Sequence, residues 1–383
     1  MDVDLLRAEM PVTRQWAYFD HAAVAPITAR AAQAMHDWAA DVAANGHANS
    51  LRWGQCLDEA RRLAGQLINA DPLDVAFVKN TSEGIGIVAE GLPWQPGDNV
   101  VTAEEEYPAN IYPWMNLKAR GVELRLVPTR DRRVQIDDLR AAMDARTRLV
   151  SLSFVEFASG YRNDLDAVGS LCRERGILFF VDAIQGLGVL PLDVQQSPID
   201  FLAADGHKWL LGPEGAGIFY IRRELVERLH PVGIGWNSVL SARDFSRIDF
   251  QLKPHAGRWE SGTPNFAGIA GLGASLAVLL EIGVPALSER LLALTDELCA
   301  RASQAGCEVY SPRGAAERSG IVSLIVPGAD PRALLRHCRK QGIIINHRAG
   351  RVRLSPHAYN TEAEIERLIA ALRAPTSQEE VGS

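Results

Sequence analysis

Short apolar runs that alternate with helical stretches constrain the fold of this chain more than any other feature of its sequence. Six runs have the composition of buried strands, at 75–78, 99–102, 123–127, 149–154, 177–181 and 201–204. Helical patterns such as 137–145 separate them. Strands that alternate with helices form a mostly parallel sheet covered on both faces. The sequence therefore predicts an α/β fold over residues 13–255.

The C-terminal third has a different pattern. After a turn at 259–264, a long helical region runs to Leu298, and short strand patterns at 321–326, 343–346 and 352–354 then alternate with helices at 331–341 and 361–372. Helices packed on a short sheet form a smaller α+β domain. We predict four parts in all: an N-terminal arm (1–12), a large domain (13–255), a small C-terminal domain that includes the long linking helix (256–374), and a disordered polar tail (375–383).

Composition narrows the class of protein. A chain of 383 residues that is 47% hydrophobic can bury a large core, and its net charge of −7 argues against a nucleic-acid surface. The N-terminus lacks a basic segment followed by an apolar one, and the apolar run at 266–280 is too short to span a membrane. The five cysteines are scattered, which indicates neither a disulfide framework nor a zinc site. We expect a cytoplasmic enzyme without a bound metal.

Lys208 is the first candidate catalytic residue that the pattern of strands and turns indicates. It lies in the turn between the apolar run at 201–204 and a second run at 217–221. Lysine is rarely buried without a partner, so a lysine at the end of a buried strand indicates an amine used for Schiff-base chemistry. A solvated surface lysine is the alternative.

Asp182 supplies the context for Lys208. It ends the apolar run at 177–181, and a residue at the carboxyl end of a parallel strand faces the crevice where α/β sheets bind ligands. Pyridoxal phosphate (PLP) needs a lysine for its aldehyde and an acid paired with its pyridinium nitrogen. Lys208 and Asp182 fit these two roles, although an aspartate in this position can also simply begin a loop.

A polar turn after the run at 75–78 offers a place for a phosphate. Thr81 and Ser82 stand where a helix begins, and hydroxyls with unpaired N–H groups at a helix N-terminus form an anion site. An ordinary helix cap is the alternative, and one residue can serve both purposes.

The same segment formally resembles a dinucleotide fingerprint. Gly84-x-Gly86-x-x-Ala89 follows a strand, with acidic residues at 104–106. The match is weak because these glycines fall inside the helix instead of forming the turn. An NAD-dependent dehydrogenase also leaves Lys208 and Asp182 without a role.

At this point the chain resembles a known family, the class V aminotransferases of PLP fold-type I. The resemblance covers nearly the whole chain and rests on segments in the same order: YFDHAAVAP (18–26), NTSEGI (80–85), EYPANIYPW (106–114), VDAIQ (181–185), GHKW (206–209), WESGTPNFAGIAGLGASL (259–276) and VRLSPHAYNTEAEIERL (352–368). It implies the fold-type I architecture, PLP as the cofactor, an amino acid as the small-molecule substrate, and a homodimer.

The resemblance also implies a role for each matching residue. Lys208 would form the Schiff base and then move the proton at Cα, while Asp182 would pair with the ring nitrogen. The remaining expected contacts are Tyr107 stacked on the ring, Gln185 on the phenolic oxygen, Thr81, Ser82, Asp205 and His207 near the phosphate, Gly262 and Thr263 at the partner's phosphate, Arg353 on the substrate carboxylate, and His21 and Ala22 on the substrate side.

Some residues depart from the family's pattern. Cysteine desulfurases and selenocysteine lyases stack a histidine where Tyr107 stands here, and desulfurases have a nucleophilic cysteine in a loop that corresponds to 343–355, which contains none. Cys338 precedes that stretch on a predicted helix and is interpreted as a packed thiol. A desulfurase that works through a protein persulfide is therefore disfavoured. Asp205 replaces a small hydroxyl residue and would repel the phosphate unless it points away.

The reaction is harder to predict than the cofactor. Transamination, racemisation and elimination at Cβ all begin at Cα, and Tyr107, His207, His21 and His347 are the groups that could direct the proton. An aminotransferase-like reaction is our first hypothesis. A carbon–sulfur lyase or an epimerase, resembling the isopenicillin N epimerase branch, is the second. A dehydrogenase and a non-catalytic dimer that only binds the cofactor are more distant alternatives.

Overall fold

A seven-stranded sheet lies at the centre of the computed structural model, which describes residues 3–373. Its strand order is β2-β10-β9-β8-β7-β3-β4. The strands are β2 (Val75–Val78), β3 (Asn99–Ala103), β4 (Glu123–Val127), β7 (Thr147–Ser153), β8 (Leu178–Asp182), β9 (Phe201–Asp205) and β10 (Gly217–Ile221). The strands from β4 to β9 pair in parallel, and β10 runs antiparallel to both of its neighbours. The predicted mostly parallel sheet is confirmed.

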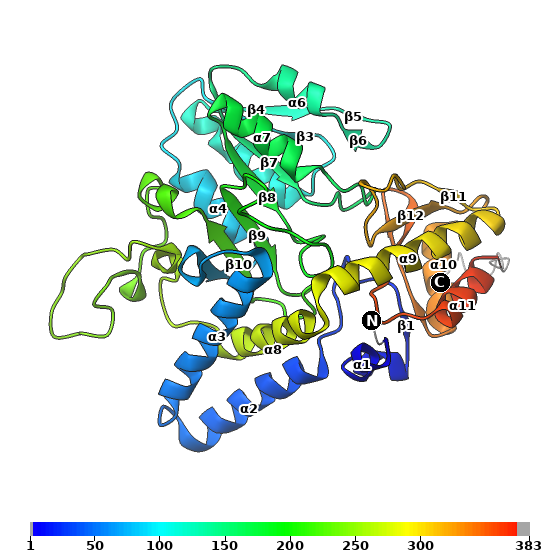
Figure 1. Ribbon diagram of the computed structural model, residues 1–383, viewed down its shortest axis with the longest axis horizontal. Coiled ribbons are helices and arrows are strands. Elements are labelled where there is room, and N and C mark those ends of the chain that lie inside the picture. The colour runs from blue at the N-terminus through cyan, green and yellow to red at the C-terminus, as the bar shows by residue number, and fades with distance from the viewer. Residues whose placement is uncertain (1–2, 374–383) are drawn as a thin grey trace.

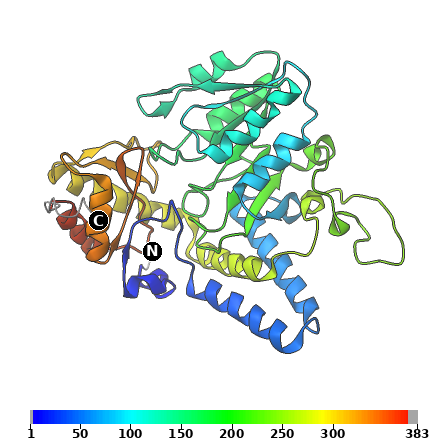
Figure 2. The ribbon, with the colours of Figure 1, turned by 180° about the vertical axis from the view of Figure 1, so that it is seen from behind.

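Helices cover both faces of this sheet (Figures 1 and 2). Within β8, Phe179 and Val181 belong to one apolar cluster and Leu178 and Phe180 to another, because successive side chains point to opposite faces. The helices of the large part are α2 (Ala29–Asn45), α3 (Ser50–Ile68), α4 (Thr81–Gly91), α5 (Tyr112–Asn116), α6 (Ile136–Ala142) and α7 (Leu165–Arg175). Buried residues of α3 and α7 join the first cluster, and those of α4 and α5 join the second.

A bent pair of helices connects the sheet to the C-terminal part (Figure 1). They are α8 (Phe266–Ile282) and α9 (Val284–Gln304), which meet at an angle of 80° around Gly283. α2 and α3 pack against α8. No single helix among residues 3–373 is long and apolar enough to cross a membrane, although this bent pair passes that test by length and composition.

The C-terminal part has its own core. A four-stranded sheet of order β11-β12-β15-β14 lies beside two helices. Its elements are β11 (Glu308–Val309), β12 (Val322–Ile325), α10 (Pro331–Lys340), β13 (Ile343–Ile344), β14 (Asn346–Arg348), β15 (Arg351–Leu354) and α11 (Glu362–Arg373). β1 (Ala17–Tyr18) pairs in parallel with β13, which brings the chain segment after α1 (Val3–Ala8) against the C-terminal part. The expected fold-type I architecture is confirmed, whereas the predicted tail at 375–383 lies outside the described residues.

A long segment between β10 and α8 projects from the body of the molecule as a loop (Figures 1 and 2). It exposes a set of large apolar side chains, namely Trp236, Leu240, Phe245, Ile248 and Phe250, of which Ile248 is 96% exposed. Exposed apolar residues gathered in one segment indicate a surface that another molecule covers.

Candidate active site

A cavity of about 330 Å³ opens where the chain leaves the carboxyl ends of β8 and β9. Because Asp182 and Asp205 are the last residues of neighbouring parallel strands, their side chains reach the same edge of the sheet. Ten of the predicted site residues line this cavity: Ala22, Thr81, Ser82, Tyr107, Asp182, Gln185, Asp205, His207, Lys208 and Arg353. Residues that are up to 331 positions apart in the sequence thus meet at one place.

Lys208 is buried inside the cavity, with 9% of its surface exposed. Burial lowers the pKa of its amine to about 8, because the charged form loses solvation, while Asp182 partly offsets this and Arg353 adds to it. Nζ of Lys208 lies 5.6 Å from the centroid of the Tyr107 ring. An amine with a lowered pKa beside an aromatic face is suited to forming a Schiff base.

We expect the covalent attachment of PLP to the cofactor-free enzyme to follow the titration of Lys208. Only the neutral amine adds to an aldehyde, so the rate should rise about tenfold per pH unit below pH 8 and level off above it, given a pKa of about 8. Borohydride trapping followed by mass spectrometry of the Lys208 peptide at a series of pH values measures this rate. A rate that keeps rising to pH 10 would show an ordinary, solvated lysine.

Asp182 lies at the floor of the site among other acids. Its burial raises the pKa of its carboxyl group to about 6, against a backbone hydrogen bond from Ile184 and the charge of Lys208. Glu106 is also buried, accepts hydrogen bonds from the N–H and hydroxyl of Ser153, and has a pKa raised to about 7 by burial. The pKa of Glu156 is raised further by burial and by Glu106. A cationic ring nitrogen next to Asp182 would offset this concentration of carboxyl groups.

The opposite end of the cavity has the properties of a phosphate site. Asn80 caps α4 by accepting a hydrogen bond from the N–H of Glu83, which places Thr81 and Ser82 in the first turn of an eleven-residue helix. His207 contributes an imidazole at the same end. Hydroxyl groups, a helix N-terminus and a histidine together suit a phosphate dianion.

The carboxylate of Asp205, which the sequence placed near the expected phosphate, is already occupied by protein groups. Oδ1 accepts a hydrogen bond of 2.7 Å from the N–H of Gly206, and Oδ2 lies 2.9 Å from Nδ1 of His207. The angle at His207 is not that of a hydrogen bond, so this contact is an ion pair when the imidazole is protonated. Both oxygens of Asp205 thus have a protein group beside them, which answers the question raised by the sequence about where this carboxylate points.

The glycines of α4 explain why the dinucleotide fingerprint is misleading. A Cβ at Gly84 would lie 2.6 Å from Cβ of Ala203, so this glycine lets α4 approach β9 closely. Gly84 and Gly86 both lie within the helix and not in the turn before it. Gly84 thus serves helix–strand packing, a Cβ at Gly86 would meet no atom within 4 Å, and the dehydrogenase hypothesis loses its only sequence support.

Gln185 is held in place by two protein contacts. Its Oε1 accepts a hydrogen bond from the indole N–H of Trp209, and its Nε2 donates to the carbonyl of Ala22. These contacts fix which end of the amide is the donor and leave the second hydrogen on Nε2 for a ligand. This geometry agrees with the predicted donor to a phenolic oxygen.

Arg353 is a buried cation with unused donors. It is 1% exposed, its Nη1 donates to the carbonyl of Phe157, and its Nη2 lies 3.6 Å from Oδ1 of Asp20. Nε and Nη2 have no hydrogen-bond partner among the described residues. Since unpaired buried donors are costly, this guanidinium is suited to a carboxylate that binds it through two hydrogen bonds.

Two histidines that the sequence placed near the substrate lie elsewhere, which corrects the predictions for them. His21 is fully buried, with Nδ1 next to the carbonyl of Ser355 and Nε2 next to the hydroxyl of Tyr359. Because both ring nitrogens are used, it is a packing residue, and burial lowers its pKa to about 4. His347 lines a different cavity, between α10 and β13. Neither can direct a proton at the site.

Gly262 and Thr263 are also outside the cavity. They line a separate pocket of about 280 Å³ together with Lys79 and Glu83. Within one protomer, Thr263 therefore makes no contact with the phosphate end. This placement leaves it available to a second copy of the chain.

The residues present fit PLP. The cavity has a buried amine for the aldehyde, a buried acid for the ring nitrogen, an aromatic ring for one face, and hydroxyl donors for the phosphate. The unpaired nitrogens of Arg353 remain for the carboxylate of a substrate. By contrast, no cluster of three or more histidine, cysteine or acidic side chains among residues 3–373 could hold a metal ion.

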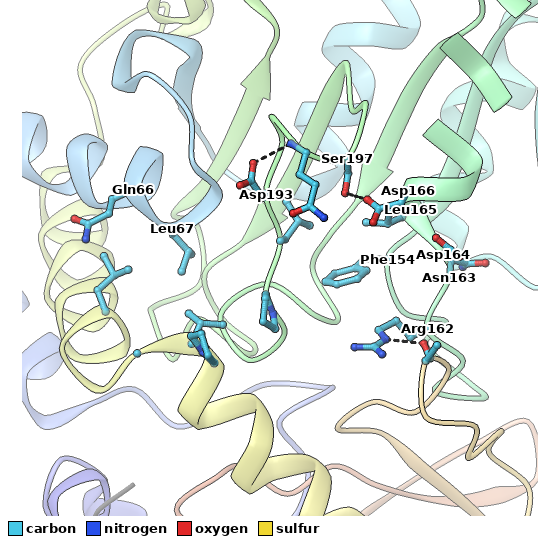
Figure 3. A pocket seen from close by; sticks show the side chains of 18 residues that line it. Gln66, Leu67, Phe154, Arg162, Asn163, Asp164, Leu165, Asp166, Asp193 and Ser197 are labelled. Carbon is cyan, nitrogen blue, oxygen red and sulfur yellow. Dashed lines mark hydrogen bonds between the residues drawn. The ribbon is translucent and has the colours of Figure 1, made fainter. Parts of the chain in front are cut away.

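A larger cavity, of about 620 Å³, lies near the bend between α8 and α9 (Figure 3). Its polar groups are already satisfied. Arg162 donates to the carbonyls of Ala315 and Ala316, and Asp166 accepts from Ser197. None of the predicted site residues reaches this cavity, so its size does not indicate chemistry.

Phe157 and Arg348, which line the smaller cavity, and Glu106, which does not line it, were given no role by the sequence. Phe157 packs edge-on against Tyr107, with ring centroids 5.2 Å apart, and so orients that ring. Glu106 is a buried acid close enough to Asp182 for the charge of Asp182 to help raise its pKa, and Arg348 lines the cavity from the β14–β15 hairpin. Only Glu106 had a detectable signal, since it precedes Tyr107 in a segment already singled out. The other two depend on contacts between distant parts of the chain.

No cysteine lines the candidate site. Cys172, Cys299, Cys307 and Cys338 are buried, and Cys56 is partly buried on α3. Cys338 has a pKa raised to about 11 by burial. A buried thiol with a raised pKa is a poor nucleophile, in agreement with its interpretation as a packing residue.

Comparison with known proteins places the chain among PLP enzymes. The family model described as aminotransferase class-V matches residues 17–368. A probable cysteine desulfurase of Methanothermobacter thermautotrophicus is 33% identical over 96% of both chains. The apo structure of a cysteine desulfurase from Thermococcus onnurineus has a TM-score of 0.89 at 26% identity and covers 97% of both chains.

The fold is also that of C-DES, a cystine C–S lyase. Its complex with the reaction product cysteine persulfide has a TM-score of 0.89 at 24% identity, covering 95% of this chain and 99% of that one. In another structure of C-DES, a lysine-to-alanine variant, glycine is covalently linked to the PLP cofactor.

Proposed function

Because this chain belongs to the class V aminotransferase family of PLP-dependent enzymes, we propose that it is a carbon–sulfur lyase that breaks the Cβ–S bond of a cysteine derivative. This proposal takes the place of our first hypothesis, an aminotransferase. The observation that supports it most directly is the similarity, over nearly the whole chain, to relatives named as cysteine desulfurases. Desulfuration and elimination both begin with cleavage of a carbon–sulfur bond.

The residues of the cavity have separable tasks in this reaction. PLP, when bound, supplies an electron sink for the charge that develops at Cα. Arg353 binds the α-carboxylate and thereby orients the substrate, and Lys208 takes the proton from Cα. Asp182 keeps a positive charge on the ring nitrogen, and Tyr107 covers the ring face. The electron pair of the broken Cβ–S bond leaves with the sulfur.

We further propose that the sulfur leaves in a small molecule and is not transferred to the protein. A persulfide enzyme needs a cysteine that reaches the substrate, and none of the five cysteines lines the cavity in the part of the chain that the structure describes. Where desulfurases resembling this chain have a cysteine loop, β14 and β15 are joined by only two residues, Ala349 and Gly350.

Incubation of the holoenzyme with a panel of amino acids, with and without a 2-oxo acid, tests the reaction type. A lyase releases pyruvate and reduced sulfur without the 2-oxo acid. Product that requires the 2-oxo acid would instead establish transamination, and loss of optical rotation without pyruvate would establish epimerisation.

The fate of the sulfur is tested with cysteine variants. We expect Cys56→Ser and Cys338→Ala to keep the rate of sulfur release within about twofold of the wild type, because neither thiol touches the cavity. Alkylation followed by mass spectrometry during turnover should find no persulfide on the protein. A persulfide on either cysteine, with loss of activity in the matching variant, would contradict release into solution.

We also propose that the active form is a homodimer in which Thr263 contacts the partner's phosphate site. Two observations support this. Thr263 lies outside the cavity of its own protomer, and the neighbouring segment exposes apolar side chains such as Phe245 and Ile248. An amino acid is the other binding partner, and we place the enzyme in the cytoplasm.

Thr263→Val is expected to weaken PLP binding about tenfold, the loss of one hydrogen bond to a charged group. Mixing Lys208→Ala protomers with Thr263→Val protomers gives mixed dimers that show which protomer makes the contact. Contact within a protomer leaves one defect in each of the two sites. Contact in trans puts both defects in one site and leaves the other intact, so activity should rise on mixing at a PLP concentration too low to fill the Thr263→Val site. No recovery in proven mixed dimers would contradict the shared site.

A further inference from the structure

Two further carboxyl groups lie buried within electrostatic range of Asp182. Glu106 follows β3 in the loop that leads to Tyr107, Glu156 follows β7, and each is 5% exposed. Neither glutamate has an ion pair with a basic side chain among residues 3–373. Because a buried carboxylate without a cation is costly, such a group of acids needs a compensating charge or a retained proton.

Ser153 fixes Glu106 beside the strand that carries Asp182. Ser153 is the last residue of β7 and lies opposite Asp182 in the parallel pairing of β7 and β8. Its N–H donates to Oε1 of Glu106 at 2.6 Å, and its hydroxyl donates to Oε2 at 2.5 Å. The N–H of the next residue, Phe154, donates to the carbonyl of Asp182. Both oxygens of Glu106 are therefore held by a single residue at the edge of the sheet.

Glu156 is connected to the same serine through Asn163. Nδ2 of Asn163 donates to Oε1 of Glu156 at 2.8 Å and to the carbonyl of Ser153 at 2.9 Å. Oε2 of Glu156 is buried and has no hydrogen-bond partner among the described residues. The two glutamates thus differ, because both oxygens of Glu106 accept hydrogen bonds and only one oxygen of Glu156 does.

This difference decides which glutamate keeps its proton. Hydrogen-bond donors favour the ionised form of a carboxyl group, and a buried oxygen without a donor favours the neutral form. Burial raises the pKa of Glu106 to about 7. Burial, and then the charges of Glu106 and Glu105, raise the pKa of Glu156 well above its usual value, and Asp182 adds to the pKa shift of both glutamates. At pH 8, Glu106 is therefore ionised and Glu156 is neutral.

The cations of the cavity are already shared with other acids. Lys208 is the cation that acts on Asp182, and Asp205 acts on Lys208 as well. Arg353 lies 3.6 Å from Asp20. A protonated ring nitrogen of PLP beside Asp182 would bring one more positive charge to this end of the cavity.

We propose that Glu106 is a positioning residue that acts on the cofactor through Asp182, because its negative charge stabilises a protonated ring nitrogen, whereas Glu156 stays neutral. This inference rests on the pairing of Asp182 with the ring nitrogen, which belongs to the proposed function. It does not depend on which bond at Cα or Cβ is then broken.

The binding of two cofactors to the cofactor-free enzyme tests this role. PLP and its 1-deaza analogue, which has a carbon in place of the ring nitrogen, share the aldehyde and the phosphate, but only PLP has a ring that takes up a proton. The ratio of their dissociation constants at pH 8, followed by absorbance, isolates the ring nitrogen. Glu106→Gln should lower the preference for PLP about tenfold, the effect of one nearby charge in a buried site.

Three further variants are measured beside Glu106→Gln. Asp182→Asn removes the acid next to the ring nitrogen and should lower the preference for PLP at least as much. Glu156→Gln replaces a neutral carboxyl group with a neutral amide, so the preference should stay within about twofold of the wild type. Ser153→Ala removes one donor to Glu106 but no carboxyl group, and should lower the preference about threefold. This variant keeps the test decisive if Glu106→Gln does not fold.

The effect of Glu106→Gln should also depend on pH. The pKa of Glu106 is about 7 in the cofactor-free protein, so this carboxyl group is mostly protonated at pH 6 and mostly ionised at pH 8. The difference in preference between the wild type and Glu106→Gln should therefore shrink as the pH falls from 8 to 6. A purely structural role of Glu106 would weaken both cofactors equally at every pH.

The outcomes separate this inference from the function on which it rests. An equal loss of affinity for both cofactors in Glu106→Gln, or the same drop in preference in Glu156→Gln, would overturn the role of Glu106. An unchanged preference in Asp182→Asn would overturn the pairing of Asp182 with the ring nitrogen, and with it the route by which Glu106 acts. Release of pyruvate tests the lyase reaction and does not enter these measurements.

Discussion

Lys208→Ala is expected to reduce turnover by about 10³-fold or more and to abolish covalent attachment of PLP. The loss combines two tasks, since the same amine holds the cofactor and moves the proton at Cα, and general base catalysis alone contributes about 10²- to 10⁴-fold. No other lysine lines the cavity among residues 3–373. A substitute amine is therefore not at hand.

Borohydride reduction and peptide mass spectrometry measure the attachment, and pyruvate release measures turnover. Lys118→Ala is a suitable control, because Lys118 is exposed and lines a different pocket, so its loss should change neither quantity. The variant at Lys208 should unfold at nearly the same temperature as the wild type without cofactor, since it removes a buried cation. Retention of a reducible adduct in Lys208→Ala would refute the assignment.

The strands of the large sheet could be predicted because they are fully buried. Each is a continuous apolar run bounded by polar residues, and the observed limits of β8 and β9 differ from the predicted ones by one residue. Asp182 and Lys208 followed from the same logic, since the carboxyl ends of parallel strands meet at one edge. The position of each residue relative to its own strand was enough to predict that it lies at the site.

Residues whose place depends on distant contacts could not be predicted in this way. His21 belongs to a buried aromatic cluster with Trp209, His357 and Tyr359. Its two ring nitrogens are occupied by the carbonyl of Ser355 and the hydroxyl of Tyr359, more than 330 residues away in the sequence. Arg348 enters the cavity only because a two-residue turn aligns β14 with β15. Neither arrangement has a local sequence pattern.

The reaction type could not be predicted from the site residues, for a chemical reason. Lys208, Asp182 and Arg353 would be needed equally for transamination, epimerisation and elimination, because all three reactions begin at Cα. What separates them is the group that receives or returns the proton and the bond placed for cleavage. The proposal of elimination in place of transamination therefore rests on the similarity to the relatives, and not on the cavity residues that all three reactions share.

Asp182→Asn is expected to lower kcat by about 10²-fold or more while the cofactor remains covalently attached. The amide has nearly the same shape but no charge, so it can no longer stabilise a protonated ring nitrogen in a buried site. Lys208 remains in place, and the adduct on Lys208 should therefore still be trapped by borohydride. Loss of rate with retention of the adduct distinguishes this variant from Lys208→Ala.

Asp200→Asn is a matched control for the effect of a buried carboxylate on chemistry. Asp200 also has a pKa raised by burial, but it lies at the start of β9, where it accepts a hydrogen bond from Phe179 and pairs with Arg222. Its amide should affect stability and leave the rate of the folded enzyme unchanged. An equal loss of kcat in both variants would show that Asp182 acts through the fold and not through the ring nitrogen.

Asp182→Asn should stabilise the cofactor-free protein, although it lowers the activity of the holoenzyme. The pKa of Asp182 is about 6 in the folded state, above its ordinary value of 3.8, so folding disfavours its ionised form. The stability that the protonated carboxyl group provides is present below about pH 4 and is lost as the pH rises to about 6, which amounts to about 3 kcal/mol. Cofactor-free Asp182→Asn should therefore be the more stable protein at pH 7.

Denaturant unfolding of both cofactor-free proteins between pH 4 and pH 8 tests this. The advantage of Asp182→Asn should grow as the pH rises to about 6 and then stay constant, and PLP should narrow it because a cationic ring nitrogen offsets the buried carboxylate. An advantage that does not change with pH would mean that folding leaves the pKa of Asp182 at its ordinary value. The argument that a cationic ring nitrogen offsets the cost of burying this carboxylate would then fail, because burial would not disfavour its charged form.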